Sequence, residues 1–299
     1  MGTSHQRCDL IMCLERSFIP KKVISGVFSF SEILQSYRDM LRPRIIPCLL
    51  IKNNGLVKTV QFGDSKYVGD PINAVRIFNE KEVDELIVID IDASSQKLEP
   101  DYSLIKNLAA ECRMPLCYGG GVKTVEQIQK IISLGVEKVA ISSSAIDHPE
   151  LITQAADQVG SQSVVVVLDV KKTGILRHYE LFTHNGKNKT GINPVEYARQ
   201  VEALGAGELV INSIDQDGMM QGYDLPLIQS VRDSISLPIT ALGGAGSLAD
   251  IEGLIAKFGI IGAAAGSLFV FKGKYRAVLI NYPDRATKDA LIEKAFNLV

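Results

Sequence analysis

The sequence predicts an α/β domain folded as a (β/α)8 barrel, the TIM barrel, built from two repeated half-barrels. Three observations support this: eight short apolar runs alternate with amphipathic segments, 299 residues suffice for such a barrel, and landmarks of the first half recur in the second at constant spacing. Parallel strands are covered on both faces and therefore read as continuous apolar runs. Eight such units favour a closed barrel over an open sheet.

The eight predicted strands follow one another from Arg44 onward. Apolar residues at helical spacing separate most of them, as over residues 125–132 and 251–255, and Thr124 and Ser247 are expected to cap these two helices. Residues 40–299 are therefore assigned to the barrel. The predicted strands cover residues 44–51, 85–91, 115–119, 138–143, 164–170, 208–213, 238–242 and 260–265.

Residues 1–39 precede the first predicted strand and contain only a short helical pattern, over residues 30–37. We interpret this segment as an N-terminal extension outside the barrel and assign no chemistry to it.

An internal repeat divides the barrel into two halves. The string Glu85-Leu86-Ile87-Val88 recurs as Glu208-Leu209-Val210-Ile211, 123 residues later. Three further pairs have the same spacing: Pro115 and Pro238, Gly120-Gly121 and Gly243-Gly244, Ser144 and Ser267. A repeat of this length predicts two fused four-unit half-barrels that bring similar groups to one face.

Composition limits the classes of partner and cofactor. The formal net charge of −2 gives no electrostatic reason to expect nucleic acid or a membrane surface as a partner. No apolar run reaches the ~18 residues of a membrane span, and the first residues lack the order of a signal peptide. We expect a cytoplasmic protein with reduced thiols and neither metal nor cofactor, since the cysteines lack zinc-site spacing. They are Cys8, Cys13, Cys48, Cys112 and Cys117.

Two glycine turns follow predicted strands at the C-terminal end of the barrel, where such folds carry their active sites. Gly119-Gly120-Gly121 precedes one helix and Gly243-Gly244-Ala245-Gly246 another, and Ser142-Ser143 and Gly266-Ser267 follow the next strands. Glycine lets backbone N–H groups approach an anion, although a tight turn alone also requires it. Because the turns are related by the repeat, we predict two phosphate cups for a ligand with a phosphate at each end.

Carboxylates are predicted at the same rim. Asp169 ends the fifth strand between two apolar residues, where a capping role does not explain it, and it is the candidate general acid or base. Asp90, Asp92, Asp215 and Asp217 could also serve as general acid or base, and the alternative role of a helix or turn cap suits Asp217 and Asp92. Lys52, Lys58 and Lys171 could attract an anionic substrate or be solvated surface lysines.

Four charged residues begin strands at the opposite end of the barrel. They must pair there, because an isolated buried charge is very costly. The pairs would form either a plug that closes the base or a gate that admits a small neutral molecule. The four residues are Arg44, Glu85, Lys138 and Glu208.

Several strings of the chain resemble the HisF family, the cyclase subunits of imidazole glycerol phosphate synthase. The resemblance extends from about Met40 to Phe271. The strings include Arg44-Ile45-Ile46-Pro47-Cys48-Leu49, Gly160-Ser161-Gln162-Ser163-Val164-Val165, Gly205-Ala206-Gly207-Glu208, Ser213-Ile214-Asp215-Gln216-Asp217-Gly218 and Gly222-Tyr223-Asp224, together with the two glycine turns.

The resemblance implies a heterodimer with a HisH-type glutaminase, which docks at the base and passes ammonia through the charged ring. It also implies that the cups hold the ends of a bisphosphorylated ribulosyl-aminoimidazole. Gln162 matches a family position, and Lys58 matches a substrate-closing loop after the first strand. The implied phosphate contacts are Gly120, Gly121, Ser142 and Ser143 in one cup and Asp217, Gly218, Gly243, Gly244, Gly266 and Ser267 in the other.

One position departs from the family pattern. The resemblance implies an acid/base pair of aspartates ending strands one and five, and only Asp169 is present because Leu50 occupies the first position. Leu50 and neighbouring strings are more similar to a HisF-like branch associated with surface-polysaccharide genes, which implies an ammonia supply for sugar amidation. The alternatives are a working cyclase of histidine biosynthesis and a HisA-type phosphosugar isomerase.

Overall fold

The computed structural model describes residues 42–96, 98–175, 177–273 and 275–297. The compact unit that holds the barrel runs from Pro43 to Val299. The extension predicted over residues 1–39, with its helical pattern and with Cys8 and Cys13, lies outside the described residues.

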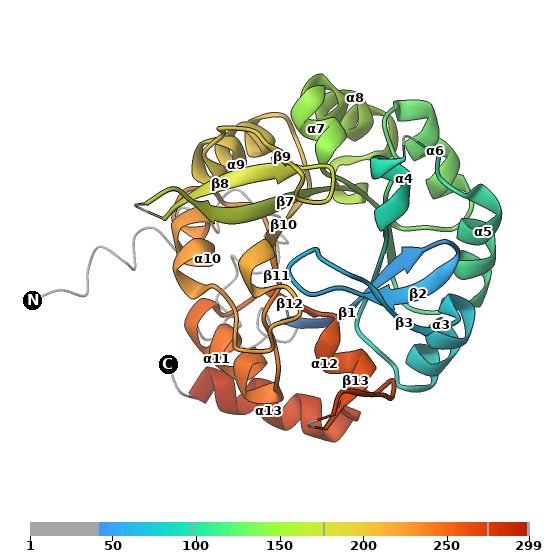
Figure 1. Ribbon diagram of the computed structural model, residues 1–299, viewed down its shortest axis with the longest axis vertical. Coiled ribbons are helices and arrows are strands. Elements are labelled where there is room, and N and C mark those ends of the chain that lie inside the picture. The colour runs from blue at the N-terminus through green and yellow to red at the C-terminus, as the bar shows by residue number, and fades with distance from the viewer. Residues whose placement is uncertain (1–41, 97, 176, 274, 298–299) are drawn as a thin grey trace, which may run out of the picture. The chain divides into compact units, whose positions relative to one another are not determined.

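Eight parallel strands close into a barrel, which confirms the predicted (β/α)8 fold (Figure 1). Closure is shown at the first strand, where Arg44 lies opposite Gly262 of the last strand and Cys48 lies opposite Ile87 of the next. The strands are β1 (Arg44–Lys52), β4 (Leu86–Asp90), β5 (Leu116–Gly119), β6 (Lys138–Ile141), β7 (Val164–Thr173), β10 (Glu208–Ser213), β11 (Ile239–Leu242) and β12 (Gly262–Ala265).

Helices surround the strands on all sides (Figure 1). The predicted caps are confirmed: Thr124 and Ser247 each accept the backbone N–H of the third helical residue and complete a capping box. The outer helices are α3 (Pro71–Glu80), α5 (Tyr102–Glu111), α6 (Val125–Ser133), α8 (Glu150–Val159), α9 (Pro194–Ala203), α10 (Leu225–Arg232), α11 (Leu248–Phe258) and α13 (Arg285–Asn297).

Two β-hairpins extend the first strand of each half-barrel beyond its C-terminal end. Strand β1 continues into an antiparallel pair with β2 (Gly55–Lys58), which pairs with β3 (Lys66–Gly69). Strand β7 continues in the same way into β8 (His178–Thr183) and β9 (Asn188–Lys189). The predicted half-barrel repeat therefore extends to the rim, although the sequence reading placed only loops there.

Some predicted strand ends were displaced. The fifth strand was expected to end at residue 170 but continues to Thr173, because its last residues pair with β8. The fourth was expected to reach residue 143 but ends at Ile141, since Ser143 begins the short helix α7 (Ser143–Asp147). The last strand begins at Gly262 rather than residue 260. After the last strand, the short helix α12 (Ser267–Val270) occupies the place that α7 has after the fourth strand. The hairpin of β13 (Phe271–Lys272) and β14 (Ala277–Val278) follows it.

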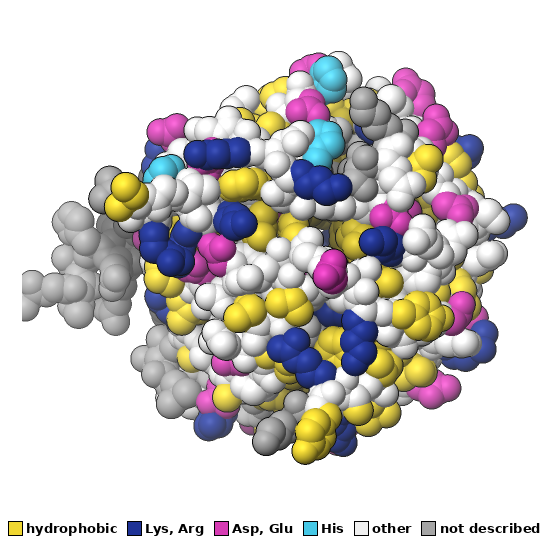
Figure 2. Space-filling model, in the orientation of Figure 1, with side chains coloured by type: hydrophobic (Ala, Val, Ile, Leu, Met, Phe, Trp, Pro, Cys, Tyr) yellow, Lys and Arg dark blue, Asp and Glu magenta, His cyan; other side chains and the backbone are white. Residues whose placement is uncertain are grey.

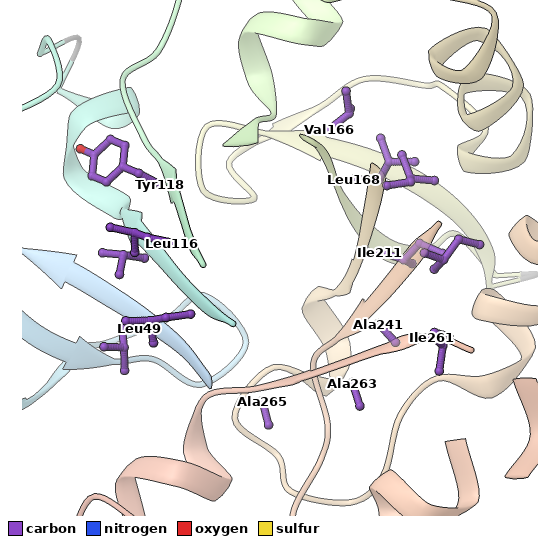
Figure 3. Close-up of a cluster of buried hydrophobic side chains, with 14 of the residues drawn as sticks. Leu49, Leu116, Tyr118, Val166, Leu168, Ile211, Ala241, Ile261, Ala263 and Ala265 are labelled. Atoms are coloured by element: carbon purple, nitrogen blue, oxygen red, sulfur yellow. The ribbon is translucent and has the colours of Figure 1, made fainter. Parts of the chain in front are cut away.

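Alternate residues of each barrel strand face outward and inward. The outward residues pack under the helices, as Leu49, Leu168 and Ile211 do in Figure 3. The inward residues form a second, smaller apolar cluster inside the barrel. Within the described ranges, no helix combines the length and the apolar character that a bilayer span requires.

Candidate functional site

A chamber of about 450 Å³ opens at the C-terminal end of the barrel, on the face turned to the viewer in Figure 2. Both glycine turns contribute to its wall, and Asp169 lies in the wall between them. Side chains of Lys and Arg gather around the middle of this face (Figure 2), as a site for an anionic ligand requires.

The residues predicted to form the first cup line the chamber. Gly120 has a φ of +114°, and a Cβ there would come within 2.3 Å of the carbonyl oxygen of Asp90, so only glycine fits this turn. The Ser142 hydroxyl donates to Asp169 at 3.3 Å, and the Ser143 hydroxyl accepts the backbone N–H of His184 at 3.0 Å. Gly121 also lines the chamber. These bonds fix both serines before any ligand binds.

The residues predicted to form the second cup also line the chamber, and they follow strands of the second half-barrel. Gly243 and Gly244 both have positive φ, and a Cβ on Gly244 would lie 2.0 Å from the carbonyl oxygen of Gly222. Gly266 precedes α12, and the Ser267 hydroxyl is buried without a hydrogen-bond partner. A buried hydroxyl without a partner is costly, so this group is free to bond to a ligand in the chamber.

Asp217 and Lys58 meet in a buried ion pair that the sequence did not predict. Lys58 Nζ lies 2.6 Å from Asp217 Oδ1, and the Thr59 hydroxyl donates to Asp217 Oδ2 at 2.8 Å. Gln61 adds a backbone bond to the Asp217 carbonyl at 2.8 Å. The Asp217 carboxylate therefore fastens the β2–β3 hairpin over the mouth, and any phosphate contact at Asp217 or Gly218 would come from the backbone.

Asp169 is the best-defined ionisable group of the chamber. Its Oδ1 accepts a hydrogen bond of 2.8 Å from the Asn212 amide, and its Oδ2 accepts the longer bond from Ser142. Burial raises the pKa of Asp169 to about 6, with the negative charge of Asp217 adding to the rise, while its two hydrogen-bond donors oppose it. Such a carboxyl can exchange a proton near neutral pH.

The remaining predicted carboxylates of this rim accept hydrogen bonds from backbone N–H groups. Asp90 caps the short helix α4 (Ile91–Ser95) by accepting the N–H groups of Asp92 and Ala93. Asp92 accepts the N–H of Asn53 at 3.1 Å, and Asp215 accepts that of Lys172 at 2.9 Å. Asp90 therefore caps a helix, whereas Asp92 and Asp215 accept backbone N–H groups from other segments. The Asp217 carboxylate, for which a cap was also expected, anchors a hairpin instead.

Of the other predicted cations and family positions, Lys52 lines the chamber. Lys171 lies in the extended part of β7, with its ammonium 5.9 Å from the centre of the Phe182 ring. Gln162 lies before β7 in the 3-10 turn Ser161–Ser163 and is exposed.

Leu50 faces the chamber from β1 and lies opposite Ile89 of β4 in the ladder. Cys48 lies below it on the same strand. Leu50 therefore extends the apolar interior of the barrel into the chamber wall. It can exclude water but cannot transfer a proton.

A cluster of buried apolar side chains lies below the chamber in the barrel interior. Burial raises the pKa of Cys48 to about 12, so its thiol is neutral at physiological pH. Burial raises the pKa of the Cys117 thiol as well. We call this inward-facing cluster the bore; it consists of Ile46, Cys48, Ile87, Cys117, Ala140, Val165, Val210 and Ala264.

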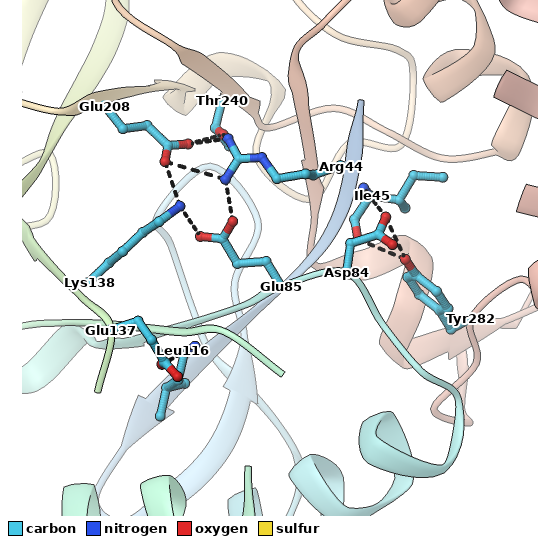
Figure 4. A network of polar contacts seen from close by, with 10 residues as sticks. All are labelled: Arg44, Ile45, Asp84, Glu85, Leu116, Glu137, Lys138, Glu208, Thr240 and Tyr282. Atoms are coloured by element: carbon cyan, nitrogen blue, oxygen red, sulfur yellow. Dashed lines mark hydrogen bonds and ion pairs between the residues drawn. The ribbon is translucent and has the colours of Figure 1, made fainter. Parts of the chain in front are cut away.

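The four charges predicted at the base meet in one ring below the bore (Figure 4). Arg44 contacts Glu85 and lies 2.7 Å from Glu208, and Lys138 lies 2.8 Å from each of the same two glutamates. Thr240 donates to Glu208 at 2.6 Å, a contact that the sequence reading missed. The predicted pairing is confirmed, and each carboxylate has two cationic partners.

The charges of the ring hold one another ionised. Burial alone would lower the pKa values of Arg44 and Lys138, but Glu208 and Glu85 outweigh it and raise both. Burial would raise the pKa of Glu208, and the two cations outweigh it and lower that pKa. The ring is thus a closed set of two cations and two anions across the axis of the barrel.

Several chamber residues were missed because they lie outside the predicted strands or lack a distinctive motif. Asn212 is the second-last residue of the sixth strand, β10, and belongs to no motif. The turn between β8 and β9 adds His184, Asn185 and Lys187 to the wall. Asn185 donates to the carbonyl of Ile91, which ties this turn to the first half-barrel.

Among the residues that the structure describes, no group of three or more His, Cys, Asp or Glu side chains is placed to hold a metal ion. Comparison with known proteins gives one matching family model, described as histidine biosynthesis protein, over residues 44–276.

Three similar proteins align with this chain over almost their whole length. A Leptospira borgpetersenii protein, provisionally named imidazole glycerol phosphate synthase subunit HisF, is 58% identical over 252 residues, 84% of this chain and 99% of its own. A Vibrio vulnificus protein, provisionally named subunit hisF3, is 55% identical over 87% of this chain and 100% of its own. A Pseudomonas aeruginosa protein, provisionally named subunit hisF2, is 54% identical over 82% and 97%.

Proposed function

This chain belongs to the HisA/HisF family of histidine biosynthesis proteins, and on that premise we propose that it is the synthase subunit of a two-protein glutamine amidotransferase. A HisH-type glutaminase docks at the base of the barrel and releases ammonia there. The ammonia passes the charged ring and the bore, and it reaches the chamber, where a phosphorylated ligand binds in the two cups.

One observation carries this proposal: the ring, the bore and the chamber follow one another along the barrel axis. The chamber wall itself includes Ile87, Cys117 and Val210 of the bore, so the floor of the chamber is the upper end of that cluster. An apolar passage favours neutral ammonia over ammonium, because a charged ion would lose its hydration without compensation.

The ring fits a gate better than a permanent plug because of how its members are exposed. The side chains of Arg44 and Lys138 are 28% and 19% exposed, whereas those of Glu85 and Glu208 are only 4% and 7% exposed. The cations can therefore be contacted from the base, and a lysine on a flexible stem can turn outward while Arg44 continues to hold both glutamates.

We propose further that the ammonia is delivered to a separate acceptor, in sugar amidation during surface-polysaccharide synthesis. Leu50 supports this, because an aliphatic side chain replaces one of the two groups that ring closure needs. The relatives numbered hisF2 and hisF3 are consistent with a copy that works beside a first one.

The test of ammonia delivery uses the purified chain and a HisH-type glutaminase. Release of labelled ammonia from amide-labelled glutamine should rise on addition of this chain by about 5- to 150-fold, the range typical of a coupling between two sites. A rate of glutamine hydrolysis that is unchanged at saturating concentrations of the chain would contradict the proposal.

A second candidate function, the cyclase of histidine biosynthesis, is favoured by Asp169. This carboxyl is held by Asn212 and Ser142 in the position of a working acid or base. Under the first proposal the parent chain does not cyclise the bisphosphate substrate, and Leu50→Asp raises turnover by ~10²–10⁴-fold. Substantial turnover by the parent chain would favour the cyclase instead. The ring at the base disfavours the third candidate, a HisA-type isomerase, which needs no ammonia.

A further inference from the structure

Exposed apolar side chains concentrate on two hairpins beside the chamber mouth. Of the eight large apolar side chains that are exposed among the described residues, five lie on or next to the β2–β3 and β13–β14 hairpins. Tyr67 is 66% exposed and Tyr275 is 89% exposed. In Figure 2, hydrophobic and basic side chains lie together over β3 and β13, below the centre of the face.

The two hairpins form one surface because they contact each other. Lys66 of β3 donates to the carbonyl of Arg276 at 3.3 Å, and its ammonium lies 5.2 Å from the centre of the Phe271 ring. Arg276 in turn donates to the carbonyl of Gly218 at 3.1 Å, and Gly218 lines the chamber. We call this surface the rim patch; it consists of Tyr67, Tyr275, Val278 and Leu279 with Lys66, Lys272 and Arg276.

The chemistry of ammonia requires a cover on this side of the barrel. Ammonia that enters water at neutral pH is protonated to ammonium and ceases to be a nucleophile. With Leu50 in the chamber wall, the nitrogen has to leave through the mouth to reach its acceptor. A protein seated on the adjoining rim would shelter that exit.

The composition of the rim patch indicates the kind of partner. Tyrosine and arginine are the side chains that most often dominate binding energy in protein interfaces. The rim patch as defined contains three cations and no carboxylate, so the complementary surface is acidic. A second copy of this chain would bring a second basic patch to the same contact, which disfavours a symmetric dimer there.

We propose that the rim patch is the docking surface of the enzyme that consumes the ammonia, a protein whose contacting face carries carboxylates around apolar or aromatic side chains. This inference rests on the proposed function. It places the acceptor enzyme at the opposite end of the barrel from the glutaminase.

The first experiment places a photo-crosslinking amino acid at Tyr275 in the native cell. The expected product joins this chain to an enzyme that transfers nitrogen to an acceptor. Ile175, which is fully exposed at the tip of the β7–β8 hairpin, is the matched control and should not give that product. Crosslinking to a second copy, to residues 1–41 of the same chain, to a protein that does not use ammonia, or to nothing would overturn the proposal.

The second experiment combines the captured enzyme with this chain and the glutaminase. In the double variant Tyr67→Ser, Tyr275→Ser, transfer of nitrogen from glutamine should fall at least about tenfold, as loss of two interface tyrosines implies. Transfer from added ammonium and stimulation of the glutaminase should stay at the parent level. Ile175→Ser should change none of the three rates.

These readouts separate the two levels of inference. If the parent chain fails to stimulate the glutaminase, the proposed function is wrong. If stimulation is intact but the double variant transfers glutamine nitrogen at the parent rate, the docking surface is wrong and the proposed function stands.

Discussion

Lys138 offers the sharpest test of the charged ring. The substitution Lys138→Met keeps the length of the side chain and removes both of its ion pairs, each 2.8 Å long. At an effective dielectric of about 20, each contact represents roughly 6 kcal/mol of attraction, which desolvation of the charges largely offsets. Breaking a buried pair from one side commonly costs about 3–5 kcal/mol. We expect a loss of this size, a large part of the usual stability of a domain.

The loss should depend on pH with a defined sign. In the parent chain the pKa of Glu208 is lowered, so its contribution to stability is present at neutral pH and declines as the pH falls through that pKa. Without Lys138, Glu85 and Glu208 share Arg44, and the pKa of one carboxyl rises. The stability difference between parent and variant should therefore be largest at pH 7 and shrink toward pH 4.

Urea unfolding of both chains at pH 7, 5 and 4 measures this difference. Lys106→Met on α5 is the control, because Lys106 is exposed on the outer surface far from the ring. A Lys138→Met variant that is as stable as the control at pH 7, or a stability difference that grows on acidification, would refute the reasoning.

Three further predictions concern the chamber. Burial raises the pKa of Asp169 to about 6 from an ordinary 3.8, so the charged carboxylate destabilises the folded chain by roughly 3 kcal/mol at most above pH 6. In urea titrations, Asp169→Asn should therefore be more stable than the parent at pH 7 and equally stable at pH 4. Ser267→Ala should leave the melting temperature unchanged or raise it, since the Ser267 hydroxyl has no hydrogen-bond partner. The same substitution should weaken binding of inorganic phosphate by about tenfold in calorimetry, and unchanged binding would contradict a phosphate cup at Ser267. Asp217→Asn should speed amide hydrogen exchange over residues 55–69 by about tenfold or more, because the lost ion pair with Lys58 fastens that hairpin, while residues 178–189 serve as the internal reference.

The sequence alone determined the barrel, because a parallel strand buried on both faces leaves an apolar run whatever its neighbours are. All eight runs became barrel strands, and the spacing of 123 residues located equivalent glycine turns in the two halves. The turns at Gly120 and Gly244 were also readable, since a backbone with positive φ in close contact with another chain segment admits only glycine.

Only the tertiary structure decided which polar groups pair. Asp217 looked like a turn residue, yet it holds Lys58, which lies 159 residues earlier, and Asn212 had no sequence signal for its bond to Asp169. The hairpins beyond β1 and β7 were missed because their strands bury polar side chains, such as Lys58, Glu180 and Thr183, among apolar ones, so no apolar run marks them. Barrel closure sets all of these contacts, since it brings together side chains whose separation along the chain carries no local pattern.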